Sequence, residues 1–231
     1  MHVRLVSYSR PTEEFEQHGI ADAQELIAFC ARVSNPSNQY RTETSERLIR
    51  YLIRHQHWSP LEMVSACMEI TTTRDIARQM LRHRSFSFQE FSQRYADPTR
   101  DLDFEYREPR FQDAQNRQSS LPLDMRNHEH RELARLWLER QQGIIRAARE
   151  AYTWAVDNGI AKEQARAVLP EGNTVSRLYM NGTLRSWVHF IELRSDNGTQ
   201  SEHRDVARTC AEVIAQIFPM ASGFVHEDRT T

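Results

Sequence analysis

The segment from Arg82 to Arg94 concentrates side chains that bind anions. It opens with the residues Arg-His-Arg and closes with Ser-Gln-Arg, and it directly follows an apolar helical pattern. An arginine guanidinium presents a rigid fork of donors that matches phosphate oxygens two at a time, and a serine hydroxyl adds another donor. The segment therefore predicts a site for a phosphate group.

Other polar side chains are predicted beside these arginines. Gln79 and Arg82 are three residues apart on a predicted helix, so they share one face. The pattern then becomes extended, and Glu90, Ser92 and Arg94 alternate, so a strand would direct all three to one side. This arrangement indicates a nucleotide pocket, in which arginines hold the phosphate while Gln79 and Glu90 orient the base or sugar. The alternative is a solvated, arginine-rich helix end followed by a strand with a polar face.

Three further segments carry polar residues at fixed offsets. They are His57–Glu62 with the sequence HWSPLE, Arg166–Pro170 with the sequence RAVLP, and Thr183–Arg194. In the last segment Arg185 and His189 are four residues apart, so they share one face of a predicted helix. Each segment also has a structural interpretation: a capped turn for the first, and a surface helix with an apolar inner side for the last.

In order and spacing, these segments resemble the signature of the flavin-dependent thymidylate synthases over about residues 45 to 205. The resemblance implies an enzyme that makes dTMP from dUMP with FAD as cofactor. It implies methylenetetrahydrofolate as the carbon donor and NADPH as the source of hydride through FAD. It also implies a homotetramer whose active sites are shared between subunits, and a reaction in which no protein thiol attacks the uracil ring.

The resemblance also implies roles for individual residues. Arg194 is the implied catalytic residue, because an arginine at the N3–C2 edge of uracil favours the deprotonated, electron-rich ring. The implied FAD-binding residues are Ser59, Arg82, His83, Arg84, Glu90, Thr183, Leu184, Arg185 and His189. The implied dUMP-binding residues are Gln79, Met80, Leu81, Arg82, Glu90, Phe91, Ser92, Gln93, Arg94, Arg166 and Arg194. The candidates for the folate site are His57 and Tyr95.

Two details of the resemblance concern single positions. Arg166 is implied to reach the dUMP phosphate of an adjacent subunit. The sequence departs from the family pattern at Asn197-Gly198, where relatives carry a histidine. A role held by that histidine therefore has no counterpart at Gly198.

Composition narrows the class of protein. The chain has 231 residues, which fits a single domain over residues 1–231, and the low hydrophobic share of 39% predicts that part of the core lies at subunit interfaces. The formal net charge of -2 provides no field to hold nucleic acid, and no apolar run approaches membrane-spanning length. There is no charged-then-apolar leader, and the three cysteines are far apart, so a cytoplasmic protein without disulfides is expected.

Hydrophobic periodicity predicts both strands and helices, and one of the helices is long. The resemblance implies an α+β fold in which helices flank a small, mostly antiparallel sheet, as in the thymidylate synthase complementing proteins. Strands are predicted over residues 2–8 and 63–72. Helices are predicted from Asp22, from Thr44 or Ser45 and from Thr73, and over residues 124–158, 161–169, 184–193 and 201–218. Residues 98–122 are predicted to form a long polar surface segment, either a lid or an interface, and no element is predicted over 171–182.

Metal and thiol chemistry are weaker interpretations of the sequence. His55 and His57, like His128 and His130, are two residues apart, and side chains at that spacing diverge on a helix, so no metal is expected. Cys67 lies in a predicted strand with no base beside it in sequence, so an inert thiol is expected there.

Two other functions stay open at this point. One is a module that binds RNA or DNA by stacking bases on aromatic residues near the arginines, namely Trp58, Phe86, Phe88 and Tyr95. The other is a flavin or nucleotide sensor that has lost catalysis. A flavin-loaded preparation would disfavour the first, and turnover of dUMP would disfavour the second.

Overall fold

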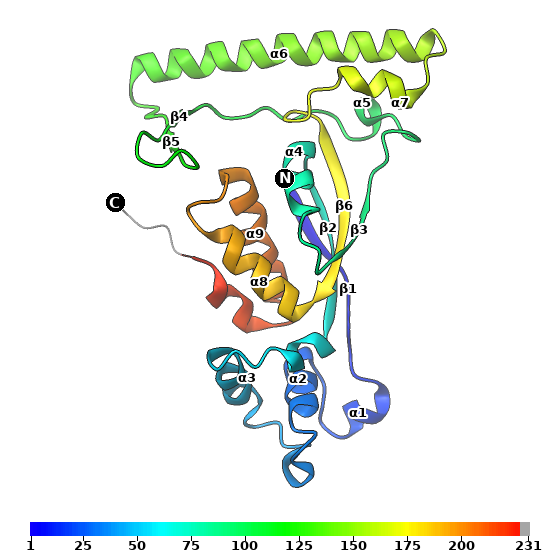
Figure 1. Cartoon of the computed structure of the whole chain (residues 1–231), viewed down its shortest axis with the longest axis vertical. Helices are drawn as coiled ribbons and strands as arrows, with labels where there is room; N and C mark the ends of the chain where they lie inside the picture. The colour runs from blue at the N-terminus through cyan, green and yellow to red at the C-terminus, as the bar shows by residue number, and fades with distance from the viewer. Residues whose placement is uncertain (227–231) are drawn as a thin grey trace.

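The centre of the fold is a four-stranded antiparallel sheet with the strand order β1-β2-β6-β3 (Figure 1). The computed structural model describes residues 1–226, and these strands are β1 (His2–Tyr8), β2 (Ser65–Thr73), β3 (Ser87–Glu90) and β6 (Val175–Thr183). Met68 and Ile70 of β2 are fully buried and lie opposite Met180 and Leu178 of β6. Because alternate residues of a strand face the same side, these side chains give the sheet one apolar face.

Helices cover this apolar face and extend from both ends of the sheet (Figure 1). They are α1 (Glu13–Gln17), α2 (Ala23–Ala31), α3 (Ser45–Arg54), α4 (Arg74–Met80), α5 (Pro98–Asp101), α6 (His128–Asp157), α7 (Lys162–Ala165), α8 (Leu184–Ser195) and α9 (Ser201–Ile214). Short 3-10 helices are η1 (Pro36–Asn38), η2 (Ser59–Met63), η3 (Arg166–Val168) and η4 (Pro219–Phe224). A separate small hairpin consists of β4 (Arg110–Gln112) and β5 (Ser120–Pro122).

The core lies between the apolar face of the sheet and the pair α8 and α9. Trp187 of α8 is fully buried there, and its indole Nε1 donates to the carbonyl oxygen of Ala66 in β2 at 3.0 Å. Val206 and Cys210 of α9 are also fully buried in this core. Packing against one rigid sheet therefore fixes the positions of the polar residues at the ends of α8 and α9.

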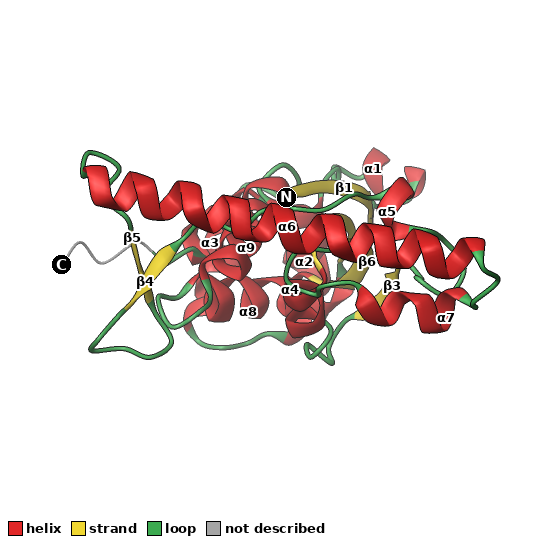
Figure 2. Ribbon diagram, turned by 90° about the horizontal axis from the view of Figure 1, so that it is seen from above, coloured by secondary structure: helices red, strands yellow, loops and turns green. Residues whose placement is uncertain are grey.

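Helix α6 lies apart from the sheet at one end of the molecule (Figures 1 and 2). Gln141 connects it to the preceding segment, because its side chain exchanges hydrogen bonds with the backbone N–H and C=O of Arg107 at 2.8 and 2.9 Å. Much of its remaining surface is apolar and exposed, through Leu133, Leu136, Trp137, Leu138, Ile144 and Trp154. Among residues 1–226, no helix has the length and apolar character needed to cross a membrane.

The structure confirms the predicted α+β class, with a small antiparallel sheet flanked by helices and one long helix. The capping box predicted at Asp22 is also present. The backbone N–H of Glu25 donates to Asp22 Oδ1 at 2.8 Å, while Glu25 Oε2 accepts from the backbone N–H of Ala21 at 2.6 Å. Asp22 therefore satisfies one of the first free N–H groups of α2, and Glu25 satisfies a backbone N–H just before the helix.

Two local expectations are wrong. Helix α4 ends at Met80, so Arg82 lies in the turn after it rather than on a helix face with Gln79. Strand β3 ends at Glu90, because Ser92 begins a turn in which its carbonyl oxygen accepts from the backbone N–H of Ala96 at 3.1 Å. Ser92 and its neighbours therefore do not continue one strand face with Glu90.

The sequence also predicted no element where β6 lies, although β6 pairs with two neighbours and is an inner strand of the sheet. The segment predicted as a polar excursion over residues 98–122 contains α5 and the β4–β5 hairpin. Both connect the sheet to α6.

Candidate active site

A hydrogen bond from Arg194 Nε to His83 Nε2, at 2.9 Å, links two segments that are distant in sequence. It joins the end of α8 to the turn after α4. Burial and the charge of Arg194 lower the pKa of His83 to about 4, so the ring is neutral at neutral pH and can accept this bond. Within residues 1–226 the two terminal nitrogens of Arg194 have no hydrogen-bond or ion-pair partner. Its guanidinium is therefore oriented through Nε and free to bind a ligand with the rest of its fork.

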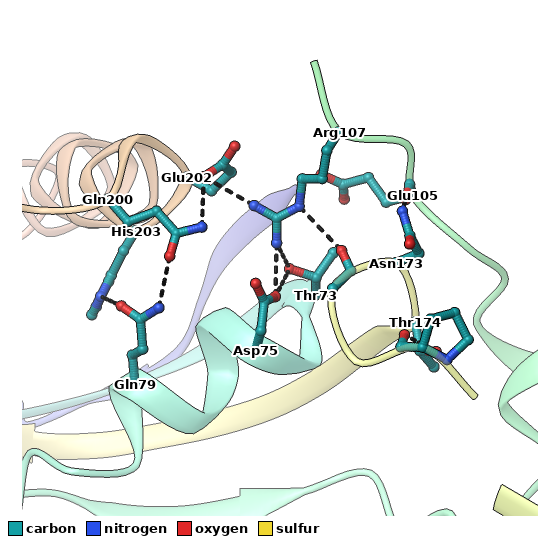
Figure 3. A network of polar contacts seen from close by, with 12 residues as sticks. Thr73, Asp75, Gln79, Glu105, Arg107, Asn173, Thr174, Gln200, Glu202 and His203 are labelled. Carbon is teal, nitrogen blue, oxygen red and sulfur yellow. Dashed lines mark hydrogen bonds and ion pairs between the residues drawn. The ribbon is translucent and has the colours of Figure 1, made fainter. Parts of the chain in front are cut away.

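Gln79 lies in a chain of side-chain hydrogen bonds near this pair (Figure 3). Its Oε1 is 3.2 Å from Nδ1 of His203, and its Nε2 donates to Gln200 Oε1 at 2.8 Å. The ring of His203 is fully buried, with its centroid 6.4 Å from that of His83. The amide of Gln79 is therefore held by two residues near the start of α9.

The chain of hydrogen bonds ends on a group of charged residues (Figure 3). Gln200 Nε2 donates to Glu202 Oε2 at 3.0 Å, and the same carboxylate pairs with Arg107 at 2.9 Å and with Arg110. Arg107 also pairs with Asp75 of α4 at 2.7 Å. Burial opposes the charge on Glu202, but the hydrogen bond from Arg110, a backbone N–H and the nearby arginine charges lower its pKa to about 2. Glu202 is therefore an ionised anchor.

Five of the residues implied to bind FAD, namely Ser59, Thr183, Leu184, Arg185 and His189, form a second group where η2 meets the start of α8, whereas Arg82, His83, Arg84 and Glu90 lie outside it. Arg185 pairs with Glu62, and the ring of Trp58 contacts His189 edge-on with centroids 4.6 Å apart. Thr183 begins α8, since its Oγ1 accepts from the backbone N–H of Ser186 at 3.3 Å. An exposed imidazole, a half-exposed guanidinium and an indole face could together hold a planar ring and an anionic group.

In the second group Ser59 is exposed and Leu184 is fully buried, and the folate candidate His57, two residues before Ser59, is exposed. The site residues of the arginine segment also differ in exposure. Arg82, Arg84 and Tyr95 are exposed, Leu81 and Phe91 are half-buried, and Met80 and Gln93 are buried. The Nε2 of Gln93 is buried and has no hydrogen-bond partner within residues 1–226.

The predicted phosphate-binding residues form a third group beside α7. Arg94 pairs with Glu163 at 3.3 Å, and Arg166 Nε donates to the carbonyl oxygen of the same residue at 3.3 Å. Ser92 Oγ accepts from the backbone N–H of Arg94 at 3.3 Å. Two arginines and a hydroxyl therefore lie close together on this part of the surface.

Glu90 is fixed beside the third group. Its Oε1 accepts from the hydroxyl of Ser176 at 2.7 Å, and Arg74 lies 3.6 Å away. It is thus positioned by β6 and by the start of α4.

The second and third groups lie at opposite ends of β6 (Figure 1). Arg185 follows the Thr183 end, whereas η3 with Arg166 precedes the Val175 end. A nine-residue strand is about 27 Å long, so one chain does not gather all the predicted residues into a single pocket.

Surface pockets lie beside these groups and elsewhere on the molecule. One of about 600 Å³ lies between the β4–β5 hairpin and α6, and Gln200 and Arg110 line it. Another, of about 580 Å³, is lined by His189, Glu192, Leu193, Asp196 and His226. A third, of about 610 Å³, is remote from Arg194 and contains five arginines, namely Arg32, Arg41, Arg47, Arg50 and Arg54.

The side chains that could take part in metal or thiol chemistry are the histidines, the acidic residues and the cysteines. Residues 1–226 contain no group of three or more histidine, cysteine, aspartate or glutamate side chains placed to hold a metal ion. Cys67 lies in β2, and burial raises the pKa of its thiol, which disfavours the nucleophilic thiolate.

Sequence reasoning missed His203, Gln200, Glu202 and Arg107. His203 lies on the same stripe of α9 as the buried Val206 and Cys210, so a polar residue on an apolar face was the signal available. The partners of Arg107 are distant in sequence, and no local pattern could have identified them.

Comparison with known proteins adds a family and several relatives. The model of the family described as "Thymidylate synthase complementing protein" matches residues 17–220. A probable flavin-dependent thymidylate synthase from Paramecium bursaria Chlorella virus 1 is 44% identical over 219 residues, covering 95% of this chain and 96% of the relative. A flavin-dependent thymidylate synthase from Synechocystis sp. is 43% identical over 220 residues, with the same two coverages of 95% and 96%.

A solved structure is also similar to this chain. It is a UMP/dUMP methylase, PolB from Streptomyces cacaoi, bound with 5-Br dUMP. The two chains superpose with a TM-score of 0.74 at 26% sequence identity, covering 96% of this chain and 93% of the other. The same methylase bound with 5-Br UMP gives a TM-score of 0.73.

Proposed function

Because this chain belongs to the thymidylate synthase complementing protein family, we propose that it is a flavin-dependent thymidylate synthase that uses FAD to methylate dUMP to dTMP. The observation that carries the proposal is the hydrogen bond between His83 and Arg194. It connects two segments that are remote in sequence and leaves the fork of Arg194 free for a ligand. We further propose that methylenetetrahydrofolate donates the carbon of the new methyl group and that NADPH supplies hydride through FAD.

Arg194 is proposed to face the N3–C2 edge of the uracil ring. Attachment of an electrophilic carbon at C5 needs an electron-rich ring, and a neighbouring cation favours the deprotonated imide. Burial lowers the pKa of Arg194, yet a guanidinium stays ionised at neutral pH even in a dry pocket. His83 fixes the direction of this cation, because a neutral ring nitrogen accepts from Arg194 Nε.

The other residues are proposed to bind and orient. Ser92, Arg94 and Arg166 suit the dUMP phosphate, since two guanidinium groups and a hydroxyl lie together there. Gln79 and Glu90 suit the base or sugar, because other side chains already hold both of them in place. The proposed roles of Met80, Leu81, Phe91 and Gln93 are to shape the same site.

The group around η2 and α8 fits FAD by its chemistry. Trp58 and His189 offer ring faces and edges for a flavin or adenine ring, and Arg185 offers a cation for a phosphate. Ser59 and Thr183 add polar groups along the same segments, and Arg82, His83 and Arg84 are proposed to add others from the turn after α4. When bound, FAD supplies redox chemistry that none of these side chains can perform. His57 and Tyr95 are exposed and are proposed as folate contacts.

We also propose that the enzyme is a homotetramer with shared active sites. The residues proposed to bind phosphate lie beside α7, and the residues proposed to bind FAD lie at the start of α8, at the opposite end of β6. A neighbouring copy would therefore bring complementary residues together. The exposed apolar residues of α6 offer a surface for such a neighbour. Residues 1–231 are proposed to form a single domain, which is supported by the packing of α9 against β1.

The test is the absorption spectrum of the purified protein, followed by turnover. Flavin absorption should bleach on addition of NADPH, and faster with dUMP present. Formation of dTMP should require methylenetetrahydrofolate, and parallel reactions with UMP measure whether the sugar 2′-hydroxyl is tolerated. A colourless protein that cannot be loaded with FAD contradicts the proposal, and a flavoprotein without turnover supports a sensor instead.

A further inference from the structure

We propose that His203 is a positioning residue that, as the neutral Nδ1–H tautomer, locks the side-chain amide of Gln79 in one of its two orientations. This inference rests on the proposed function only in assigning Gln79 to the dUMP site. The geometry that supports it is the continuous chain of hydrogen bonds from Glu202 to His203 in Figure 3.

The direction of the first hydrogen bond follows from charge. Glu202 is paired with Arg107 and Arg110 and is ionised, so its carboxylate oxygens can only accept. Gln200 must therefore present its NH2 group to Glu202 Oε2, at 3.0 Å. An amide that donates with its nitrogen on one side leaves its oxygen for the other side.

The same reasoning passes along the chain to the histidine. Gln200 Oε1 can only accept, so Gln79 must donate from Nε2 across 2.8 Å. Gln79 Oε1 is then the atom facing Nδ1 of His203, at 3.2 Å, and that nitrogen must carry the proton. Burial, together with the charge of Arg194, lowers the pKa of His203 to about 3, so the ring holds a single proton.

The consequence for the ring is an acceptor at Nε2. This atom is fully buried and has no hydrogen-bond partner among residues 1–226. An unpaired buried acceptor costs free energy. The hydrogen bonds that begin at the Glu202 carboxylate therefore stabilise this arrangement by more than the unpaired Nε2 of His203 destabilises it.

The consequence for Gln79 is a fixed polarity. One N–H and one oxygen lone pair of its amide are used, so one of each remains in a defined direction. A flipped amide would exchange donor and acceptor and mismatch a ligand that depends on them. Without the two anchors, both orientations would compete, and ligand affinity would fall.

The first experiment reads the tautomer directly. The nitrogen NMR spectrum of histidine-labelled full-length protein, without any ligand, should give a protonated, pyrrole-like Nδ1 and an unprotonated Nε2 for His203. The signal is assigned by its loss in His203→Asn. An Nε2–H tautomer or a doubly protonated ring at neutral pH overturns the inference, whatever the protein catalyses.

A second variant tests the origin of the tautomer. Gln200 is exposed, so Gln200→Leu should fold. It breaks the link between Glu202 and Gln79 and should convert a measurable fraction of His203 to the Nε2–H form. If the tautomer stays wholly Nδ1–H in Gln200→Leu, the chain of hydrogen bonds does not set it, and the inference is wrong.

The third experiment tests the positioning role. His203→Leu removes the donor, whereas His203→Asn places an amide N–H where Nδ1 was. His203→Leu should weaken dUMP binding by roughly fivefold to tenfold, with a smaller change in kcat, and His203→Asn should restore most of the affinity. Val206→Ala, on the same buried stripe of α9, is the matched packing control.

The outcomes separate this inference from the proposed function. Equal losses of affinity in His203→Leu, His203→Asn and Val206→Ala indicate packing alone and overturn the positioning role. If the wild-type protein does not bind dUMP, the proposed function fails, while the tautomer experiments still decide the polarity of Gln79.

Discussion

At the scale of single residues, the candidate site depends on neutral histidines held against charged partners. His83 accepts from Arg194 because burial and the neighbouring guanidinium keep the imidazole unprotonated. A protonated ring would repel Arg194 and lose the acceptor. One uncharged residue thus orients the charge of Arg194, and the proposed function gives Arg194 a different role from Arg94, which is proposed to bind phosphate.

Arg194→Ala should lower both dUMP affinity and turnover at saturating dUMP. Affinity should fall about tenfold or more, the loss expected for a hydrogen bond to a charged group, and turnover should fall because the ring is no longer polarised. Arg194→Lys should rescue only part of each loss, because a point charge lacks the planar fork. A dUMP titration with rates at saturation measures both effects.

Arg94→Ala is the control, because it removes a phosphate contact and leaves the uracil edge intact. It should raise the dissociation constant of dUMP and keep flavin reduction by NADPH largely unchanged at saturation. If Arg194→Ala reaches wild-type turnover at high dUMP, Arg194 only binds, and its proposed effect on the ring is wrong.

At the scale of elements, the sequence predicted α8 and α9 well but not β6. Leu178 and Met180 alternate with exposed polar residues along β6, so the strand signal was present. Asn181 and Gly182 directly follow Met180, and an Asn-Gly pair is typical of a turn, so this part of the sequence does not indicate a continuing strand. The glycine is required for a different reason: a Cβ at Gly182 would lie 2.7 Å from Cε1 of Phe86.

Gly182→Ala should therefore destabilise the fold. Phe86 is buried with its ring edge-on to Trp187, at 4.7 Å between centroids, so it has little room to move. The expected loss is about 1–3 kcal/mol in the free energy of unfolding, measured in urea. Gly143→Ala on α6 is the control, since no atom lies within 4 Å of its added Cβ and the change should stabilise slightly. If Gly182→Ala and Gly143→Ala are equally stable, the close approach of Phe86 to Gly182 does not require a glycine.

Glu202→Gln should weaken the attachment of α9 to the segment before α6. The folded-state pKa of about 2 lies below the ordinary 4.5, so this carboxylate stabilises the fold fully above about pH 4.5 and loses that contribution as the pH falls toward 2. At pH 7 the variant should be about 1–3 kcal/mol less stable, and the difference should shrink on acidification. Urea unfolding of both proteins across this pH range measures it, and a difference that persists near pH 2 contradicts the assignment.

At the scale of the whole molecule, the arrangement of the predicted site residues could not be inferred from the sequence. The motif around Ser92 and Arg94 predicted a site that binds phosphate. The turn at Ser92 and the partners of Arg107 depend on tertiary contacts and could not be predicted in this way. No local pattern could show that the residues proposed to bind FAD and those proposed to bind phosphate lie at opposite ends of β6. That separation makes the proposed assembly directly testable.

Mixing two inactive variants should restore activity if each site takes Arg194 from one chain and Arg166 from another. Arg166→Ala loses a phosphate contact, and Arg194→Ala loses the uracil contact, so either variant alone should be nearly inactive at low dUMP. After dissociation and random reassembly in equal amounts, roughly a quarter of the sites should carry both arginines. The measured rate should rise to about that fraction of the wild-type rate.

The control is the same procedure with each variant alone, which should give no recovery. Sedimentation velocity on the mixture should show the same assembly as for the wild-type protein, and an affinity tag on one variant should capture the other. Exchange of chains without recovery of activity would mean that both arginines of a site come from the same chain. That result would contradict the shared-site proposal, because Arg166 would then bind the dUMP of its own subunit.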